Sequence, residues 1–271
     1  MNDLRRELAP FSADVWDAID EEARRVLKLS LAARKLVDFI GPVGWNVSAI
    51  DLGWTRELKE APAAGVTGHL RLSQPLVELR APITLAMRDV RALERGAKDV
   101  DLQPIIDAAK ALAHAEDHAV FHGYAPAGIK GIAEEAADAK VTLSSDFAQY
   151  PTAVLEALEK LRQAGVDGPY GIALGPRCHA GLMRTLTAAG YPIIEHVKKL
   201  IDGPIVWAPA VDGAVLMSVR GGDFELTIGR DVSIGYRHHT ADQIELYLEE
   251  SMTFRAIAPE AAVPLSYGTG Q

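Results

Sequence analysis

The sequence lacks the residues and segments on which several protein classes depend. Cys178 is the only cysteine among 271 residues, which excludes a disulfide framework within one chain and a cysteine-based zinc ribbon. No apolar run approaches the roughly 18 residues of a membrane span, and the charged, amphipathic start is unlike a secretory signal. Lys/Arg-rich runs are missing, and 37 acidic residues outnumber 28 basic ones. We therefore expect a cytoplasmic protein with no membrane and no nucleic-acid partner.

Catalytic signatures are equally scarce. The chain has no nucleophile elbow, no phosphate-binding Gly-Lys-Ser/Thr loop and no dinucleotide-binding Gly-x-Gly-x-x-Gly. His114, His118 and His122 follow at i, i+4 spacing on one helix face, as in some metal-binding helices. Ala115 stands where a zincin needs its glutamate, so partly exposed histidines are favoured, and a metal-dependent hydrolase stays as an alternative. We expect no enzyme activity, no metal site and no cofactor.

The residues that are present predict a folded chain of mixed helices and strands. Hydrophobic residues make up 48%, enough for a sizeable core. Apolar residues spaced by three and four from Trp16 to Ser30 predict a first helix with Ser12 as its cap. Pro104 begins a second long helix that ends near Gly123. Further helices are expected near 151–165, 176–189 and 192–201, and strands at 170–174, 205–207, 214–219 and within 224–257. The class is therefore α+β.

From Gly41 to about Leu85 the sequence has the alternation of a long hairpin. Ile50, Leu52 and Trp54 alternate with polar or small residues, and Leu70 and Leu72 do so on the returning strand. Few large apolar residues occur from 57 to 68, and a hairpin with so little to bury is hard to stabilise alone. We therefore expect it to project and pack on a neighbour, which favours assembly over catalysis.

Short motifs along nearly the whole chain, from about residue 4 to 265, match one family in order and spacing. They are Arg6-Glu7-Leu8-Ala9-Pro10 with Trp16 and Ile19, Arg34-Lys35-Leu36-Val37-Asp38 with Gly41-Pro42, Leu93-Glu94-Arg95-Gly96, Glu116-Asp117 with Phe121, Gly128-Ile129-Lys130-Gly131, Gly168-Pro169-Tyr170, Gly190-Tyr191-Pro192, Arg220-Gly221-Gly222-Asp223-Phe224 and Ser233-Ile234-Gly235-Tyr236. In these motifs the chain resembles the family 1 encapsulins, or linocin/bacteriocin-like proteins, which are bacterial and archaeal shell proteins with the major-capsid fold of tailed phages. Ala33 stands where a common family pattern has glycine, and alanine suits a helix better.

The resemblance implies a phage major-capsid-like fold with four segments. These are an N-terminal helical arm (1–45), an extended β-hairpin loop (46–86), a peripheral domain (87–130 and 226–271) and an axial domain (131–225). It also implies a self-assembling shell protein of an icosahedral nanocompartment of about 60 subunits. The shell would enclose a cargo enzyme with a C-terminal targeting peptide, either a dye-decolourising peroxidase or a ferritin-like iron-storage protein.

Two further points concern the family's other properties. A secreted bacteriocin or peptidase, a label sometimes attached to the family, is a second alternative. Some encapsulins stack a flavin on an aromatic residue just after the hairpin, but Ala86-Met87-Arg88-Asp89 offers no aromatic ring here, so no flavin is expected.

The resemblance also implies two sites. Cargo would dock on the inner wall, between the first helix and the closing strands. The residues expected there are Leu27, Leu31, Arg34, Val37, Asp38 and Ile234. Arg34 and Asp38 would fix the register of an extended peptide, or would pair with each other. A pore for small ions and peroxide-sized solutes is expected in an axial-domain loop, with an ordinary turn as the alternative. Its residues are Ala188, Ala189, Gly190 and Tyr191.

Overall fold

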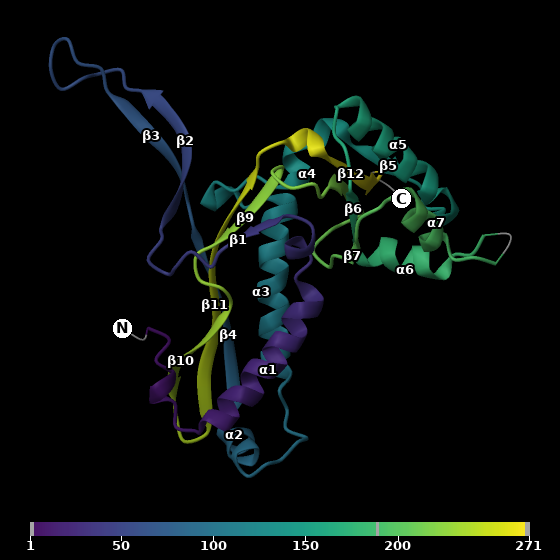
Figure 1. Ribbon diagram of the computed structural model, residues 1–271. Coiled ribbons are helices and arrows are strands. Elements are labelled where there is room, and N and C mark those ends of the chain that lie inside the picture. Colours follow the sequence, from purple (N-terminus) through teal and green to yellow (C-terminus); the bar gives the residue numbers. More distant parts are fainter. Residues whose placement is uncertain (1–2, 188–189, 269–271) are drawn as a thin grey trace.

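The computed structural model describes residues 3–187 and 190–268, which form a two-part body with a projecting hairpin (Figure 1). The helices are α1 (Ala13–Ser30), α2 (Met87–Glu94), α3 (Gln103–His122), α4 (Ile132–Glu135), α5 (Tyr150–Gln163), α6 (Pro176–Arg184) and α7 (Ile193–Leu200). The strands are β1 (Asp38–Ile40), β2 (Ala49–Glu57), β3 (His69–Pro75), β4 (Val77–Ala86), β5 (Val141–Leu143), β6 (Tyr170–Leu174), β7 (Ile205–Trp207), β8 (Ala214–Ser218), β9 (Phe224–Ile228), β10 (Ser233–His239), β11 (Gln243–Ala256) and β12 (Ala262–Tyr267). Mixed helices and sheets confirm the α+β class. Within the described ranges, no helix is both long and apolar enough to span a membrane.

A five-stranded sheet organises the elongated part of the body. Its order is β1-β9-β11-β10, and β4 pairs with β11 antiparallel from residue 77 to 86. Ala81, Ile83 and Leu85 are buried and alternate with exposed residues along β4, so the sheet has one apolar face. The helices α3 and α1 pack together against this part of the body (Figure 1).

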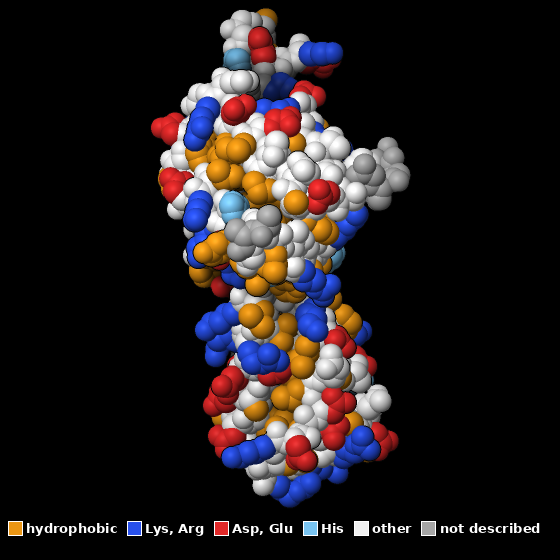
Figure 2. Space-filling model, turned by 90° about the vertical axis from the view of Figure 1, so that its right-hand side faces the viewer, with side chains coloured by type: hydrophobic (Ala, Val, Ile, Leu, Met, Phe, Trp, Pro, Cys, Tyr) orange, Lys and Arg blue, Asp and Glu red, His pale blue; other side chains and the backbone are white. Residues whose placement is uncertain are grey.

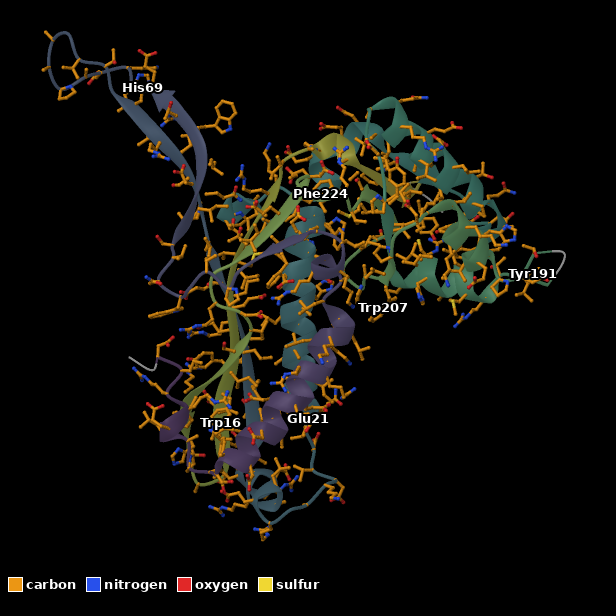
Figure 3. The ribbon with its side chains drawn as sticks, viewed as in Figure 1. Trp16, Glu21, His69, Tyr191, Trp207 and Phe224 are labelled. Atoms are coloured by element: carbon orange, nitrogen blue, oxygen red, sulfur yellow. The ribbon has the colours of Figure 1, made fainter. Side chains whose placement is uncertain are left out.

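The first helix follows the predicted pattern. The stripe from Trp16 to Ser30 is buried, and Trp16 lies between α1 and the sheet in Figure 3. Ser12 occupies the predicted cap position, but its hydroxyl makes no capping bond. Instead its backbone N–H donates to Oε1 of Glu94 at 3.1 Å. The stripe therefore fixes α1 through burial, not through its cap.

A second five-stranded sheet, β5-β12-β8-β6-β7, forms the other part of the body with α5, α6 and α7 around it. Every residue of β6 and β8 is buried, which explains their continuous apolar sequence. The strand predicted at 170–174 is confirmed. The helix predicted at 176–189 ends instead at Arg184, because Thr185 is extended and its carbonyl accepts from the N–H of Ile193 at 2.9 Å. The chain thus turns back on itself where a helix was expected.

The hairpin of β2 and β3 stands away from both sheets (Figure 1). Its two strands pair only with each other, with a register shift between Asp51 and Thr55. At its base, the amide of Gln74 donates to the carbonyl of Phe254 at 2.8 Å, which fastens it to β11. The predicted extended segment 46–86 therefore holds two structural parts, a free hairpin and the sheet strand β4. The four segment boundaries themselves stay predictions.

Candidate functional site: an apolar groove beside the first helix

A groove of about 540 Å³ lies between α1, the chain preceding it and β10. Its apolar lining consists of Leu4, Ala23, Leu27, Leu31, Val232, Ile234 and Leu248. The N–H of Tyr236 donates to the carbonyl of Leu4 at 2.8 Å, so the N-terminal segment runs beside β10 and forms one wall. Helix α1 forms the opposite wall, because Leu27 and Leu31 are one turn apart.

Four of the six residues predicted for cargo docking line this groove, and two do not. Leu27, Leu31, Arg34 and Ile234 meet there. Val37 and Asp38 line a separate hollow of about 150 Å³ that shares only Arg34 and Lys35 with the groove. They are directed there because β1 begins at Asp38 and pairs in parallel with β9. Oδ2 of Asp38 accepts from the N–H of Gly222 at 2.5 Å.

Sequence reasoning missed the remaining wall residues for two different reasons. Arg24 precedes Leu27 by three positions and Lys28 precedes Leu31 by three, so helical spacing alone could have placed them on the same face. Val232 stands two positions before Ile234, so strand alternation could have placed it on the same face, but its contact with an arm more than 200 residues earlier depends on the fold.

Beneath the groove, Arg34 binds three carboxyl groups. Its Nε lies 2.9 Å from both carboxylate oxygens of Glu116, its Nη2 3.0 Å from Oε2 of Glu250, and its Nη1 2.7 Å from Oδ1 of Asp231. Glu116 and Glu250 are fully buried, and the Arg34 side chain is only 16% exposed. The predicted alternative of an Arg34–Asp38 pair is therefore wrong. Arg34 is bound into the fold and presents little surface to a ligand.

Burial sets the protonation of this cluster. Burial raises the pKa of Glu250 well above its ordinary value, and the neighbouring charge of Glu116 raises it further. The second carboxyl oxygen of Glu250, Oε1, has no hydrogen-bond partner among the described residues. Burial alone would lower the pKa of Arg34, but hydrogen bonds and charges from its carboxylate partners raise it, so the guanidinium stays charged. The raised pKa of Glu250 fits a site where one cation faces two buried carboxyl groups.

Asp117 fastens the chain after α1 to α3. Its carboxylate accepts from the N–H of Ala32 at 2.9 and 3.1 Å and from the N–H of Ala33 at 2.8 Å. Burial raises the pKa of Asp117 to about 7, although these two hydrogen-bond donors oppose the rise. The segment that carries the groove residues Leu31 and Arg34 is thus attached through a buried carboxyl group.

The predicted pore loop joins α6 to α7. Ala188 and Ala189 lie outside the described residues. Gly190 has a φ of +81°, which favours glycine, and its N–H donates to the carbonyl of Thr187 at 2.9 Å. Tyr191 is 64% exposed and lies at the end of the molecule opposite the hairpin residue His69 (Figure 3). The loop therefore presents a largely exposed aromatic residue.

The histidines of the alternative metal site form a row along α3. The rings of His114, His118 and His122 follow one face of α3, with centroids 6.2 and 5.1 Å apart. His122 contacts the carbonyl of Ala210 at 3.0 Å through its Nε2. Among the described residues, no three metal-binding side chains form a group that could hold an ion. Cys178 is buried, which raises its thiol pKa.

The matched proteins place the chain in one family. Residues 1–253 match the family described as "Encapsulating protein for peroxidase". The chain belongs to the encapsulin shell protein family. A type 1 encapsulin shell protein of Rhodospirillum rubrum is 54% identical over 98% of this chain and 96% of its own length. One from Mycobacterium tuberculosis is 44% identical over 98% of this chain and 100% of its own length. The resemblance found in the motifs is thereby confirmed.

Solved structures confirm the capsid-like fold. A virus-like particle from Pyrococcus furiosus matches with a TM-score of 0.65 and 18% identity, over 93% of this chain and 99% of that chain. The structure of Mycobacterium phage Ogopogo matches with a TM-score of 0.57 and 10% identity, over 90% and 91% of the two chains. The encapsulin fold of this chain is that of phage capsids.

Proposed function

We propose that the chain assembles in the cytoplasm into a closed icosahedral shell of about 60 copies that encloses a cargo enzyme. The observation that carries this proposal is the hairpin, together with 54% identity to a type 1 encapsulin shell protein. Beyond its base, which Gln74 fastens to β11, the hairpin stands away from both sheets, and Trp54 on β2 is 71% exposed. A two-stranded hairpin is at best marginally stable in water, so a neighbouring copy of the chain is the natural cover.

Two variants of the hairpin test the assembly. Deleting residues 56–68 should leave small oligomers in place of large particles, measured by mass photometry or light scattering. Trp54→Ala should weaken assembly with little effect on the folding of the subunit, because most of this ring is exposed in the described chain. Intact particles from the deletion would overturn the proposal.

We also propose that the groove receives a C-terminal targeting peptide of the cargo. The groove is apolar and lies along α1. Its Leu27 is partly exposed and therefore available for contact with a peptide. An extended peptide would gain about 25 cal/mol for each Å² of apolar surface it buries there. Val37 and Asp38 would be reached only by a peptide that continues past Arg34 into the neighbouring hollow.

A pair of substitutions two residues apart tests the groove. Leu27→Asp should give empty shells of normal size, while Leu29→Asp should load normally, because Leu29 is 62% exposed and lies outside the groove lining. These substitutions separate docking from folding better than changes at Ile234 do, because Ile234 is buried in the core beneath the groove. Unchanged loading with Leu27→Asp would rule out the groove.

The cargo and the route of small solutes complete the proposal. The family description supports a peroxidase as cargo, and a ferritin-like iron-storage protein is the other candidate. Mass spectrometry of shells purified from the native cell would identify the enclosed protein. The loop with Gly190 and Tyr191 would line a pore, so deleting residues 187–190 should speed substrate entry into loaded shells. Entry rates that stay unchanged would exclude this loop as the gate.

A further inference from the structure

Positively charged side chains outnumber negatively charged ones around the groove. Five cationic residues line it, namely Arg6, Arg24, Lys28, Arg34 and Lys35, against two acidic ones, Asp20 and Asp231. The chain as a whole carries a formal charge of -9, so this local excess of positive charge runs against the composition. On the face shown in Figure 2, blue and red side chains border a band of hydrophobic ones along the lower half of the molecule.

Both acidic residues of the groove are already paired within the chain. Asp20 binds Arg6, with Nη2 and Oδ2 2.7 Å apart, and Asp231 binds Arg34 at 2.7 Å. Arg24, Lys28 and Lys35 remain, all exposed, and none of them forms a salt bridge with any described residue. Burial raises the pKa of Asp117, and the nearby charge of Lys35 only opposes that rise, without an ion pair between the two.

Helical spacing places these cations beside the apolar wall. Arg24 precedes Leu27 by three positions, and Lys28 precedes Leu31 by three, so each turn of the α1 wall offers one leucine and one cation. By contrast Arg25, which does not line the groove, is paired with Glu22 at 2.5 Å. The unpaired cations of α1 named here are therefore on the groove side.

We propose that the groove selects an extended peptide whose apolar side chains are accompanied by carboxylates. This inference rests on the proposed docking function and adds the chemistry of the ligand. The carboxylates would lie against Arg24, Lys28 and Lys35 while the apolar side chains enter between Leu27 and Ile234. Exposed ion pairs contribute little each, so two of them should favour an acidic tail about threefold to tenfold over a neutral one.

The experiment uses the full shell and a defined probe. A fluorescent protein is given a C-terminal tail of Gly and Ser with two leucines and, beside them, two Asp, two Asn or two Lys. Each fusion is produced together with the shell, and fluorescence per purified particle measures loading. We expect loading in the order Asp, Asn, Lys.

A matched pair of shell variants locates the preference. R24Q/K28Q/K35Q should load the Asp and Asn tails equally. K98Q/K110Q/K199Q removes the same charge from exposed lysines outside the groove and should keep the preference for Asp.

The possible failures point to different errors. Equal loading of Asp and Asn tails in the unaltered shell, or a preference for Lys, would overturn this inference and leave the groove as the dock. A preference for Asp that survives R24Q/K28Q/K35Q would place the charge recognition elsewhere and also overturn it. Loading of no tail by intact particles would refute docking in the groove itself. Particles of altered size from R24Q/K28Q/K35Q would show that these cations bind a second copy of the chain.

Discussion

Replacing Asp117 by Asn should remove much of the dependence of stability on pH. Asp117 is fully buried, and its pKa is about 7 in the folded chain against 3.8 in the ordinary state. Folding therefore disfavours the charged form. The free energy of unfolding that this group contributes is highest below pH 3.8, falls as the pH rises toward 7, and is level above that. At about 1.4 kcal/mol for each unit of pKa, the fall amounts to about 4 kcal/mol.

Asparagine tests this reasoning because it keeps an acceptor and cannot ionise. Its Oδ1 can still accept from the N–H groups of Ala32 and Ala33, which bind the carboxylate at 2.8 to 3.1 Å. The stability of Asp117→Asn relative to the unaltered chain should thus increase by about 3 kcal/mol between pH 4 and pH 7.

Urea unfolding followed by tryptophan fluorescence, at several pH values and one protein concentration, measures this difference. Asp107→Asn on the exposed side of α3 is the matched control for the same substitution outside the core. A difference that is constant with pH, or that decreases as the pH rises, would show that the two backbone donors keep Asp117 ionised throughout.

Three further substitutions probe the same region and the second sheet. Glu250→Gln imitates the neutral acid, so it should raise the unfolding midpoint at pH 8 more than at pH 5, since the pKa of Glu250 is raised by burial. Arg34→Ala leaves Glu116 and Glu250 buried without their cation and should cost about 3–5 kcal/mol in urea unfolding. Gly181→Ala would place a Cβ 2.1 Å from the ring of Phe147 and should lower thermal stability by about 1–3 kcal/mol. Stability equal to that of the unaltered chain would refute the packing or charge argument in each case.

The local sequence pattern was sufficient to predict an element where the buried residues of that element follow a regular spacing. The stripe from Trp16 to Ser30 and the apolar run from Tyr170 to Leu174 were both predictable, because periodicity reports directly on burial. The end of α6 was not, since the hydrogen bond between Thr185 and Ile193 depends on where α7 begins. The place of β4 was equally hidden, because its partner β11 lies more than 150 residues away.

The candidate site divides in the same way. Motif resemblance selected Arg34 through Asp38 as one block, but the block has two roles, because Arg34 turns toward α3 while Asp38 starts a strand. Helical spacing could have predicted that the cations Arg24 and Lys28 of α1 lie beside the groove. The buried carboxyl group of Glu250 was not, since only the folded sheet brings β11 under the arm.

The attachment of the arm beneath the groove is polar, and this determines how well the groove is defined. Hydrogen bonds and ion pairs hold the chain after α1 to α3 and β11 through Asp117, Glu116 and Glu250. Apolar contacts tolerate sliding by a fraction of a residue, whereas a guanidinium shared by buried carboxylates has few satisfactory positions. Leu31 and Arg34, three residues apart, are therefore held in one register against β10. A charge cluster that stabilises little on balance can still fix the shape of the groove, and its loss should loosen docking before it unfolds the chain.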